Sequence, residues 1–470
     1  MTKAENALKP VPTVLLRMKH WLGLDEAIGF TILGRSWSSF AGLVTIFLIA
    51  RFLSPDQQGY YYTFGSLVAI QIVFELGFSV VIQQMASHER AHLEILKGGE
   101  IRGEERHHSR LASILQKAVR WYSIAALALF CGLLPTGFYF FSTHKHSGVA
   151  VGWQIPWAFV ALAATLTFQI DPIFAFLEGC GDVASIARTR FFQAVTGSLL
   201  AWSVLLLHHG LFAPAMMILG QALAGLFRIW HSRQLLLGLF HFPVGPFEIA
   251  WFEEVWPFQW RIAISWISGY FIFQLFNPIL FAYRGAEAAG QMGMSLSIAS
   301  AVLNIGISWI TTKSAPFGVL IARGQFAELD RLFFRSLAQS FAVTVIGCTV
   351  TWLATLYVYN YGFALAHRLL DPLTMGLLLT TVAVNQIVFA EAIYLRSHKQ
   401  EKFLFLSVAN AFCMTLSTYF LGRLDGARGM MAAYLGVNVI IGLGMGTRTF
   451  LKFREFSQRA GTAVHASASA

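Results

Sequence analysis

The sequence consists of successive apolar runs, most of them long enough to cross a lipid bilayer as a helix. The hydrocarbon core of a bilayer is about 30 Å thick and needs roughly 20 apolar residues in a helix. Inside lipid the backbone must satisfy its own polar groups, which favours helices. We therefore predict an all-α polytopic membrane protein with about twelve transmembrane helices, near 28–50, 60–84, 119–141, 153–177, 191–207, 211–230, 257–282, 291–310, 337–359, 373–395, 403–421 and 430–449.

The composition agrees with a membrane environment. The chain is 56% hydrophobic and only 12% charged, whereas soluble domains carry about 25% charged residues. So few charged residues cannot cover the surface of a soluble protein of this length. The net charge of +10 is spread over segments between the apolar runs and does not form one basic stripe, which argues against nucleic acid as a partner.

The distribution of Lys and Arg predicts the orientation of the chain. Cytoplasmic loops of membrane proteins are enriched in these residues. If the N-terminus is cytoplasmic, the segments on the other side hold only Arg51, Lys145, Arg284, Arg368, Arg423 and Arg428. We therefore expect both termini in the cytoplasm.

The predicted helices divide the chain into two halves joined by a linker. We expect an interfacial segment at 1–26, an N-lobe of six helices at 27–231 with a cytoplasmic loop at 86–117, a cytoplasmic linker at 232–256, a C-lobe of six helices at 257–450, and a disordered cytoplasmic tail at 451–470. Gly98, Gly99 and Gly103 suggest that the loop at 86–117 forms two short surface helices with a joint between them.

A short internal repeat supports the two-lobe arrangement. The sequence Asp56-Gln57-Gln58-Gly59 follows the first helix, and Glu287-Ala288-Ala289-Gly290 follows the seventh. In both, an acidic residue precedes a glycine by three positions. Parallel repeats of this kind are typical of transporters that bind their substrate between two lobes.

Ionisable residues inside apolar helices are the best candidates for function, because they are costly when they face lipid. Arg35, Glu75 and Asp171 lie in the first, second and fourth predicted helices. Counting 1.5 Å per residue places all three about 10–13 Å from the cytoplasmic side. In one interpretation Arg35 binds an anionic headgroup while Glu75 or Asp171 binds a coupling ion. In the other, Arg35 and Glu75 form a structural salt bridge.

Two prolines and two outer arginines complete the candidate site. Proline interrupts a helix, so we expect hinges at Pro172 in the fourth helix and Pro278 in the seventh. On the outer side, Arg51 and Arg284 could receive a pyrophosphate, since guanidinium groups pair with phosphate oxygens. We expect no metal, no cofactor and no catalytic residues, because no zinc-type spacing, Walker motif or nucleophile motif occurs.

Several segments resemble a known family. The segment from Leu48 to Tyr61 contains Ala50-Arg51-Phe52-Leu53-Ser54-Pro55-Asp56, and Phe74-Glu75-Leu76-Gly77-Phe78 follows it. Together with Phe176-Leu177-Glu178-Gly179 and Lys313-Ser314-Ala315-Pro316, these are similar to Wzx-type O-antigen flippases of the multidrug/oligosaccharidyl-lipid/polysaccharide exporter (MOP) superfamily, which includes the MATE transporters.

The resemblance implies a bacterial inner-membrane flippase rather than an enzyme. Two six-helix lobes would surround a central cavity and move an undecaprenyl-pyrophosphate-linked oligosaccharide by alternating access. Protons or sodium would be coupling ions, and other polysaccharide-assembly proteins would be partners. Two alternatives stay open. One is an ion-coupled exporter of drugs or small cations with the same fold, and the other is a membrane enzyme of the O-antigen polymerase or ligase type.

Overall fold

The structure is a computed structural model that describes residues 26–96, 99–144, 151–398 and 403–468. The predicted interfacial segment at 1–26 lies outside the described residues except for Glu26. Nearly all of the described chain is helical, and the only sheet within it has two short strands. The prediction of an all-α membrane protein is confirmed.

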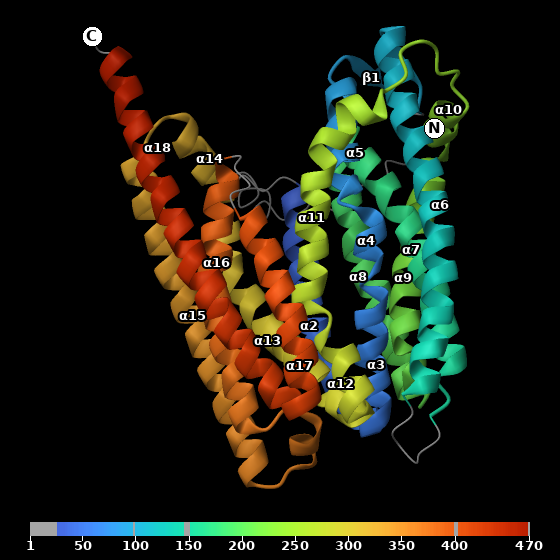
Figure 1. Cartoon of the computed structure of the whole chain (residues 1–470). Helices are drawn as coiled ribbons and strands as arrows, with labels where there is room; N and C mark the ends of the chain where they lie inside the picture. Colours follow the sequence, from blue (N-terminus) through green and yellow to red (C-terminus); the bar gives the residue numbers. More distant parts are fainter. Residues whose placement is uncertain (1–25, 97–98, 145–150, 399–402, 469–470) are drawn as a thin grey trace, which may run out of the picture.

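The first half of the chain forms a bundle that we call the N-lobe (Figure 1). Its elements are α2 (Glu26–Phe52), α3 (Pro55–Val68), α4 (Gln71–Glu75), α5 (Phe78–Arg90), α6 (Glu105–Thr143), α7 (Gln154–Gly179), α8 (Val183–Leu206), η1 (Gly210–Phe212) and α9 (Ala213–His231). Its core contains buried aromatic residues, among them Phe64, Tyr122 and Trp157. The linker contains α10 (Arg233–Phe240) and the π-helix η2 (Trp251–Val255).

The second half forms the C-lobe. Its elements are α11 (Trp256–Phe273), α12 (Phe276–Arg284), α13 (Ala286–Thr311), α14 (Ser314–Ala322), α15 (Phe326–Asn360), η3 (Ala364–Arg368), α16 (Pro372–Ser397), α17 (Leu404–Val437), the π-helix η4 (Asn438–Met445) and α18 (Gly446–Ala468). A separate core around Phe317, Phe333 and Tyr394 holds α14, α15, α16 and α18 together.

The helices match the twelve predicted crossings. By length and composition alone, the described residues contain 9 helices able to cross a membrane, or 10 if the bent pair Pro55–Glu75 and Phe78–Arg90 is one span. The 24-residue α8 packs between α2 and α9 and is long enough to be another crossing. In addition, the stretch Leu404–Ser457 contains two antiparallel crossings, because the chain reverses at Gly426, where φ is 64° (Figure 1).

The second predicted crossing is broken, which the sequence analysis missed. It is divided into α3, α4 and α5, and its two parts bend by 43° after Glu75. Leu76 and Gly77 both have positive φ, 52° and 67°. A right-handed helix cannot pass through residues in this conformation, which only glycine adopts without strain. Glu75 therefore lies at the end of a helix inside the bundle.

Two predictions about segments outside the bilayer are wrong. The loop at 86–117 does not form two short helices. Strands β1 (Leu93–Ile95) and β2 (Ile101–Gly103) pair as an antiparallel hairpin, for which the positive φ of Gly99 supplies the turn. The predicted disordered tail is also helical as far as Ala468, because α18 continues beyond the apolar stretch.

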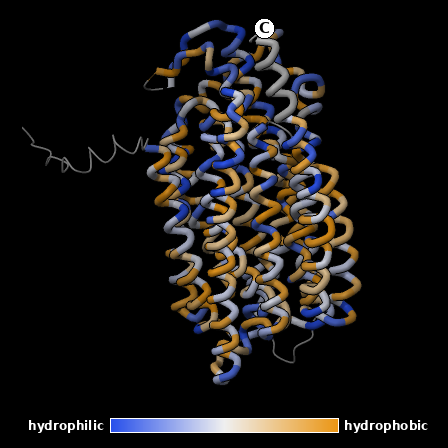
Figure 2. The backbone as a smooth tube through the Cα atoms, turned by 90° about the vertical axis from the view of Figure 1, so that its left-hand side faces the viewer, coloured by the Kyte–Doolittle hydropathy of each residue, from blue (hydrophilic) through white to orange (hydrophobic). Residues whose placement is uncertain are grey.

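The two lobes form a V (Figure 1). They meet where α3 packs on α13 and diverge toward the end that carries β1, α14 and the C-terminus. We call these the closed end and the open end. The hydrophobic residues dominate the middle of the tube and hydrophilic residues gather at the open end (Figure 2). The sequence predicts that the open end faces the cytoplasm.

Candidate transport site

Arg35 lies on an exposed polar face of α2. Helical spacing puts it on the same side as Thr31, Ser38 and Ser39, and all four residues are exposed. The opposite part of α2 packs on α8, where the indole Nε1 of Trp37 donates to the carbonyl of Ala194 at 3.2 Å. Within the described residues the Arg35 guanidinium makes neither an ion pair nor a hydrogen bond. The salt bridge between Arg35 and Glu75, which the sequence left open, is therefore absent from this structure.

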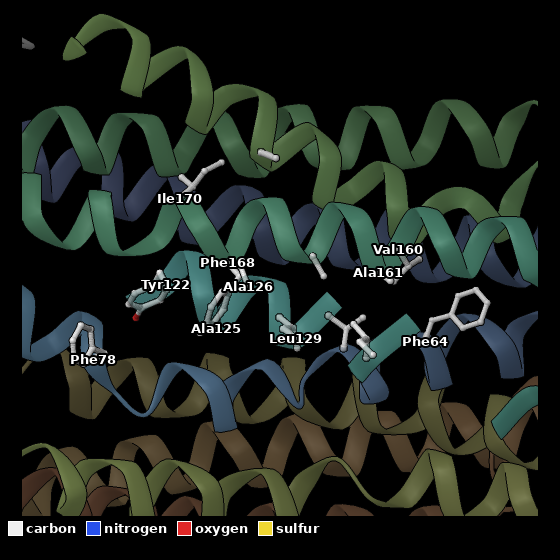
Figure 3. Close-up of a cluster of buried hydrophobic side chains, with 14 of the residues drawn as sticks. Phe64, Phe78, Tyr122, Ala125, Ala126, Leu129, Val160, Ala161, Phe168 and Ile170 are labelled. Carbon is white, nitrogen blue, oxygen red and sulfur yellow. The ribbon is translucent and has the colours of Figure 1, made fainter. Parts of the chain in front are cut away.

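Glu75 sits at the break between α4 and α5, beside α6. The hydroxyl of Ser79 donates to its Oε1 at 3.0 Å, and Ser79 is 3.3 Å from the hydroxyl of Tyr122. Tyr122 is fully buried in the N-lobe core, near Phe78 and Phe168 (Figure 3). The break therefore presents a half-buried carboxylate that accepts from the hydroxyl of Ser79, which in turn contacts the hydroxyl of Tyr122.

Asp171 lies near enough to Glu75 for their charges to interact. The two carboxylates interact electrostatically with each other and with Tyr122, and Arg190 is the cation closest in effect to Asp171. Asp171 is exposed, yet it points about 140° around α7 from the outward-facing Leu166. The exposed side chain of Asp171 therefore faces the inside of the N-lobe and not the lipid. The structure joins Glu75 and Asp171 in one site, but it does not join Arg35 to them.

The two outer arginines have different surroundings. Arg51 is exposed in the last turn of α2. The guanidinium of Arg284 donates to the carbonyl of Leu424 at 2.6 Å and to that of Arg423 at 3.2 Å. Both carbonyls lie just before the reversal at Gly426, so Arg284 stabilises the turn.

Only one of the two proline breaks exists. Helix α7 is continuous from Gln154 to Gly179 through the buried Pro172, so the predicted interruption there is wrong. The interruption near Pro278 is present, because α11 ends at Phe273 and α12 begins at Phe276. A hinge role for either proline stays a prediction.

The closed end contains a polar contact that sequence analysis did not identify. Arg368 donates to Oε1 of Gln58 at 3.2 Å and to the carbonyl of Leu53 at 2.5 Å. Gln58, which is 1% exposed, donates in turn to the carbonyl of Gly290 at 2.8 Å. Deeper between the lobes, Asn277 donates to the hydroxyl of Ser66 at 3.0 Å. We call the contact of Gln58, Arg368 and Gly290 the closed-end contact.

Comparison with solved structures defines the fold. An inward-facing multidrug resistance MATE transporter of the MOP superfamily gives a TM-score of 0.69 at 13% identity, over 92% of this chain and 99% of that chain. The chain has the MOP-transporter fold. The lipid II flippase MurJ in an inward closed conformation gives 0.60 at 14% identity, over 94% and 93%. No family profile and no curated protein sequence matches the chain.

A second MATE structure of the same superfamily gives a lower score. An outward-facing MATE transporter gives a TM-score of 0.55 at 13% identity, over 93% of this chain and 96% of that chain, below the 0.69 of the inward-facing one.

Proposed function

We propose that this protein moves an undecaprenyl-pyrophosphate-linked oligosaccharide across the bacterial inner membrane by alternating access. The observation that carries this proposal is the unpaired guanidinium of Arg35 on the polar face of α2. A cation within a membrane helix is costly unless water, a partner or a bound anion compensates it. An anionic headgroup that enters between the lobes supplies this compensation.

The geometry of a MOP fold suits such a cargo. A V that opens on one side admits a large polar headgroup, while the lipid chain stays in the bilayer. The solved MurJ structure with the same fold is of a lipid II flippase. In this proposal the cargo enters from the cytoplasmic side, and the lobes then separate at the closed-end contact to release it.

The carboxylate pair is proposed as the ion-coupling site. The charges of Glu75 and Asp171 interact within the N-lobe, and neighbouring like charges favour binding of a proton or of sodium. Glu75 lies at the end of a helix, next to two residues with positive φ. Ion binding there can therefore be linked to the bend between α4 and α5.

The test is transport in vesicles reconstituted with the full chain. The probe is a fluorescent undecaprenyl-pyrophosphate oligosaccharide, whose appearance in the opposite leaflet is measured. We expect Arg35→Ala to lower the rate about tenfold or more, since hydrogen bonds to charged groups contribute about 1.5–3 kcal/mol. Arg188→Ala, which changes an exposed arginine of α8 beside Glu26, is the matched control. Equal rates for Arg35→Ala and wild type would contradict the proposed headgroup site.

A second candidate is an ion-coupled exporter of lipophilic cations. It is favoured by the TM-score of 0.69 to a multidrug MATE transporter and by the carboxylate pair. The two candidates differ in the charge of the cargo, which is negative for the glycolipid and positive for the drug. Efflux of a cationic dye that depends on Glu75 and Asp171, without movement of the glycolipid, would favour the exporter.

A further inference from the structure

The C-lobe contains a cavity that none of the roles above uses. Its volume is about 220 Å³, and it lies between α11, α16, α17 and η4. Asn385, in the middle of α16, lines its deep part, and Arg396, near the open end of the same helix, lines its other part. The cavity therefore extends from the middle of the bilayer toward the open end.

The lining combines hydroxyl and amide groups with aromatic rings. Ser265 and Ser407 contribute hydroxyl groups and Asn410 contributes an amide. Phe273 and Phe389 form an aromatic wall, with ring centroids 6.3 Å apart. Binding sites of this composition orient a small ligand by a few polar groups and hold its apolar faces on aromatic rings. A sugar ring has both features, hydroxyl groups at its edge and C–H groups on its faces.

Several polar groups of the wall are already fixed, while others are free to bind. Asn385 donates to the hydroxyl of Tyr434 at 2.9 Å, and Asn438 donates to the carbonyl of Tyr434 at 2.8 Å. These bonds hold α16 and η4 in place. In the described part of the chain, by contrast, the side-chain hydroxyls of Ser265 and Ser407 make no hydrogen bond. The carboxamide oxygen of Asn410 likewise has no donor, and buried groups of this kind usually have a partner.

The charge and size of the cavity favour a small neutral ligand over a cation or a drug-sized molecule. None of the described residues that line it is an Asp or a Glu. The carboxylate of Glu391 lies next to the lining residue Gly446: its Oε1 accepts from the hydroxyl of Thr447 at 2.8 Å, and its Oε2 lies 4.0 Å from the position of a Cβ at Gly446. The charged residue among the described lining residues is Arg396, so the lining favours a neutral ligand over a metal or ammonium cation. Pockets for drug-sized ligands have volumes of about 300–1,000 Å³, so this cavity fits a smaller group.

We propose that the C-lobe cavity binds one neutral sugar ring of the transported glycan and so sets the sugar specificity of transport. This inference rests on the proposed flippase function. With the ring bound among Ser265, Ser407 and Asn410, the linked pyrophosphate lies toward the open end, between the lobes. A site that hydrogen-bonds a hydroxyl group discriminates strongly against ligands that lack it.

The test measures binding of lipid-linked sugars to the purified full chain. The probes are undecaprenyl pyrophosphate alone and undecaprenyl pyrophosphate that carries glucose, galactose, mannose, rhamnose, N-acetylglucosamine or N-acetylgalactosamine. We expect at least one sugar to raise the affinity above that of the lipid alone. Ser407→Ala and Asn410→Leu should reduce this gain about five- to tenfold without changing affinity for the lipid alone. Ser417→Ala, also on α17 but with its hydroxyl bonded to the carbonyl of Met414, is the matched control.

The outcomes separate this inference from the proposed function. If undecaprenyl pyrophosphate alone does not bind, the flippase proposal and the inference both fail. If it binds but no sugar adds affinity, or if the cavity variants weaken all probes equally, only the inference fails. If sodium alone stabilises the wild type and Asn410→Leu abolishes this stabilisation, the cavity is a cation site instead. Ser265→Ala removes one hydroxyl only, and it replaces Asn410→Leu should that variant not fold.

Discussion

Gly59 and Gly290 pack backbone to backbone where the two lobes meet. A Cβ at Gly290 would lie 2.9 Å from the amide nitrogen of Gly59, and a Cβ at Gly59 would lie 1.9 Å from the carbonyl oxygen of Ala286. These are the two glycines of the short internal repeat. Their contact shows why both repeats carry glycine, because any side chain would separate α3 from α13.

Gly59→Ala is therefore expected to open the closed end. Overpacking of this kind typically costs about 1–3 kcal/mol, enough to shift the balance between inward-facing and outward-facing states about tenfold. Spin labels at Gln234→Cys in α10, which packs on the N-lobe, and at Ala322→Cys in the C-lobe should report a shorter distance after the four native cysteines are replaced. Gly65→Ala on the same helix, where nothing lies within 4 Å, should leave the distance unchanged. Equal distances in both variants would contradict this role of Gly59.

Gln58→Leu tests the closed-end contact itself. Gln58 is 1% exposed and bonds to Gly290 and Arg368. Its replacement leaves a partly buried arginine without one of its acceptors, which costs about 1–3 kcal/mol. We expect faster labelling of a cysteine at Ser66 by an impermeant maleimide added at the closed end. Arg423→Ala, which removes an exposed cation stacked on Tyr283 at the same end, should not change the labelling rate, and a similar increase in that control would weaken the assignment.

Removing the charge of either carboxylate is expected to lower transport without lowering thermal stability. Glu75→Gln and Asp171→Asn keep the size of each side chain but remove its charge, so we expect transport driven by an ion gradient to fall at least tenfold. Thermal stability should not fall, because removing one of two neighbouring like charges relieves repulsion. Ser79→Ala, which removes only a hydrogen bond to Glu75, should reduce transport modestly. Unchanged gradient-driven transport in both acid variants would remove the pair from the mechanism.

The linker gives a prediction about pH. Arg110 donates to Oε2 of Glu254 at 2.5 Å and to Glu89 at 2.7 Å, which ties the linker just before the C-lobe to the open-end part of the N-lobe. The hydrogen bond from Arg110 lowers the pKa of Glu254 below its ordinary value. The stabilisation is therefore complete above the unfolded pKa of about 4.3 and is lost as the pH falls through the folded pKa.

Hydrogen exchange of the linker between pH 7 and about pH 2.5, which reaches below the lowered pKa of Glu254, measures this effect. Protection of residues 249–255 should fall at low pH in the wild type. In Glu254→Gln the protection of these residues should be lower at pH 7 and should depend less on pH. Glu253→Gln changes the exposed neighbour, for which the described residues show no ion pair, and should behave like the wild type. If the pH dependence persists in Glu254→Gln, another titrating group causes it.

Sequence analysis predicted the crossings because lipid leaves few choices. A run of about 20 apolar residues must form a helix there, so α6, α9 and α16 follow from hydropathy alone. The break in the second crossing was missed because one Gly after Glu75 is a weak signal in an apolar run. The opposite error occurred at Pro172, where packing around the buried ring keeps α7 continuous.

The candidate site was predictable only in part. Arg35, Glu75 and Asp171 were found because charges in apolar helices are rare. Their grouping depended on rotation about each helix axis, which placed Asp171 beside Glu75 and left Arg35 on a separate face. Arg368 and Gln58 could not be connected from sequence, since 310 positions separate them. The C-lobe cavity brings together residues from four helices, none of which carries a motif.

The sequence by itself determined that this chain lies in a membrane, where its helices are, and that two halves carry a matching glycine turn. These properties follow from the free energy of placing each residue in lipid or water, which is local. Only the tertiary structure decided that the two turns touch, that the lobes diverge at one end, and that Glu75 and Asp171 share a site. Those relations depend on how side chains pack between helices, and packing joins residues that are distant in the chain.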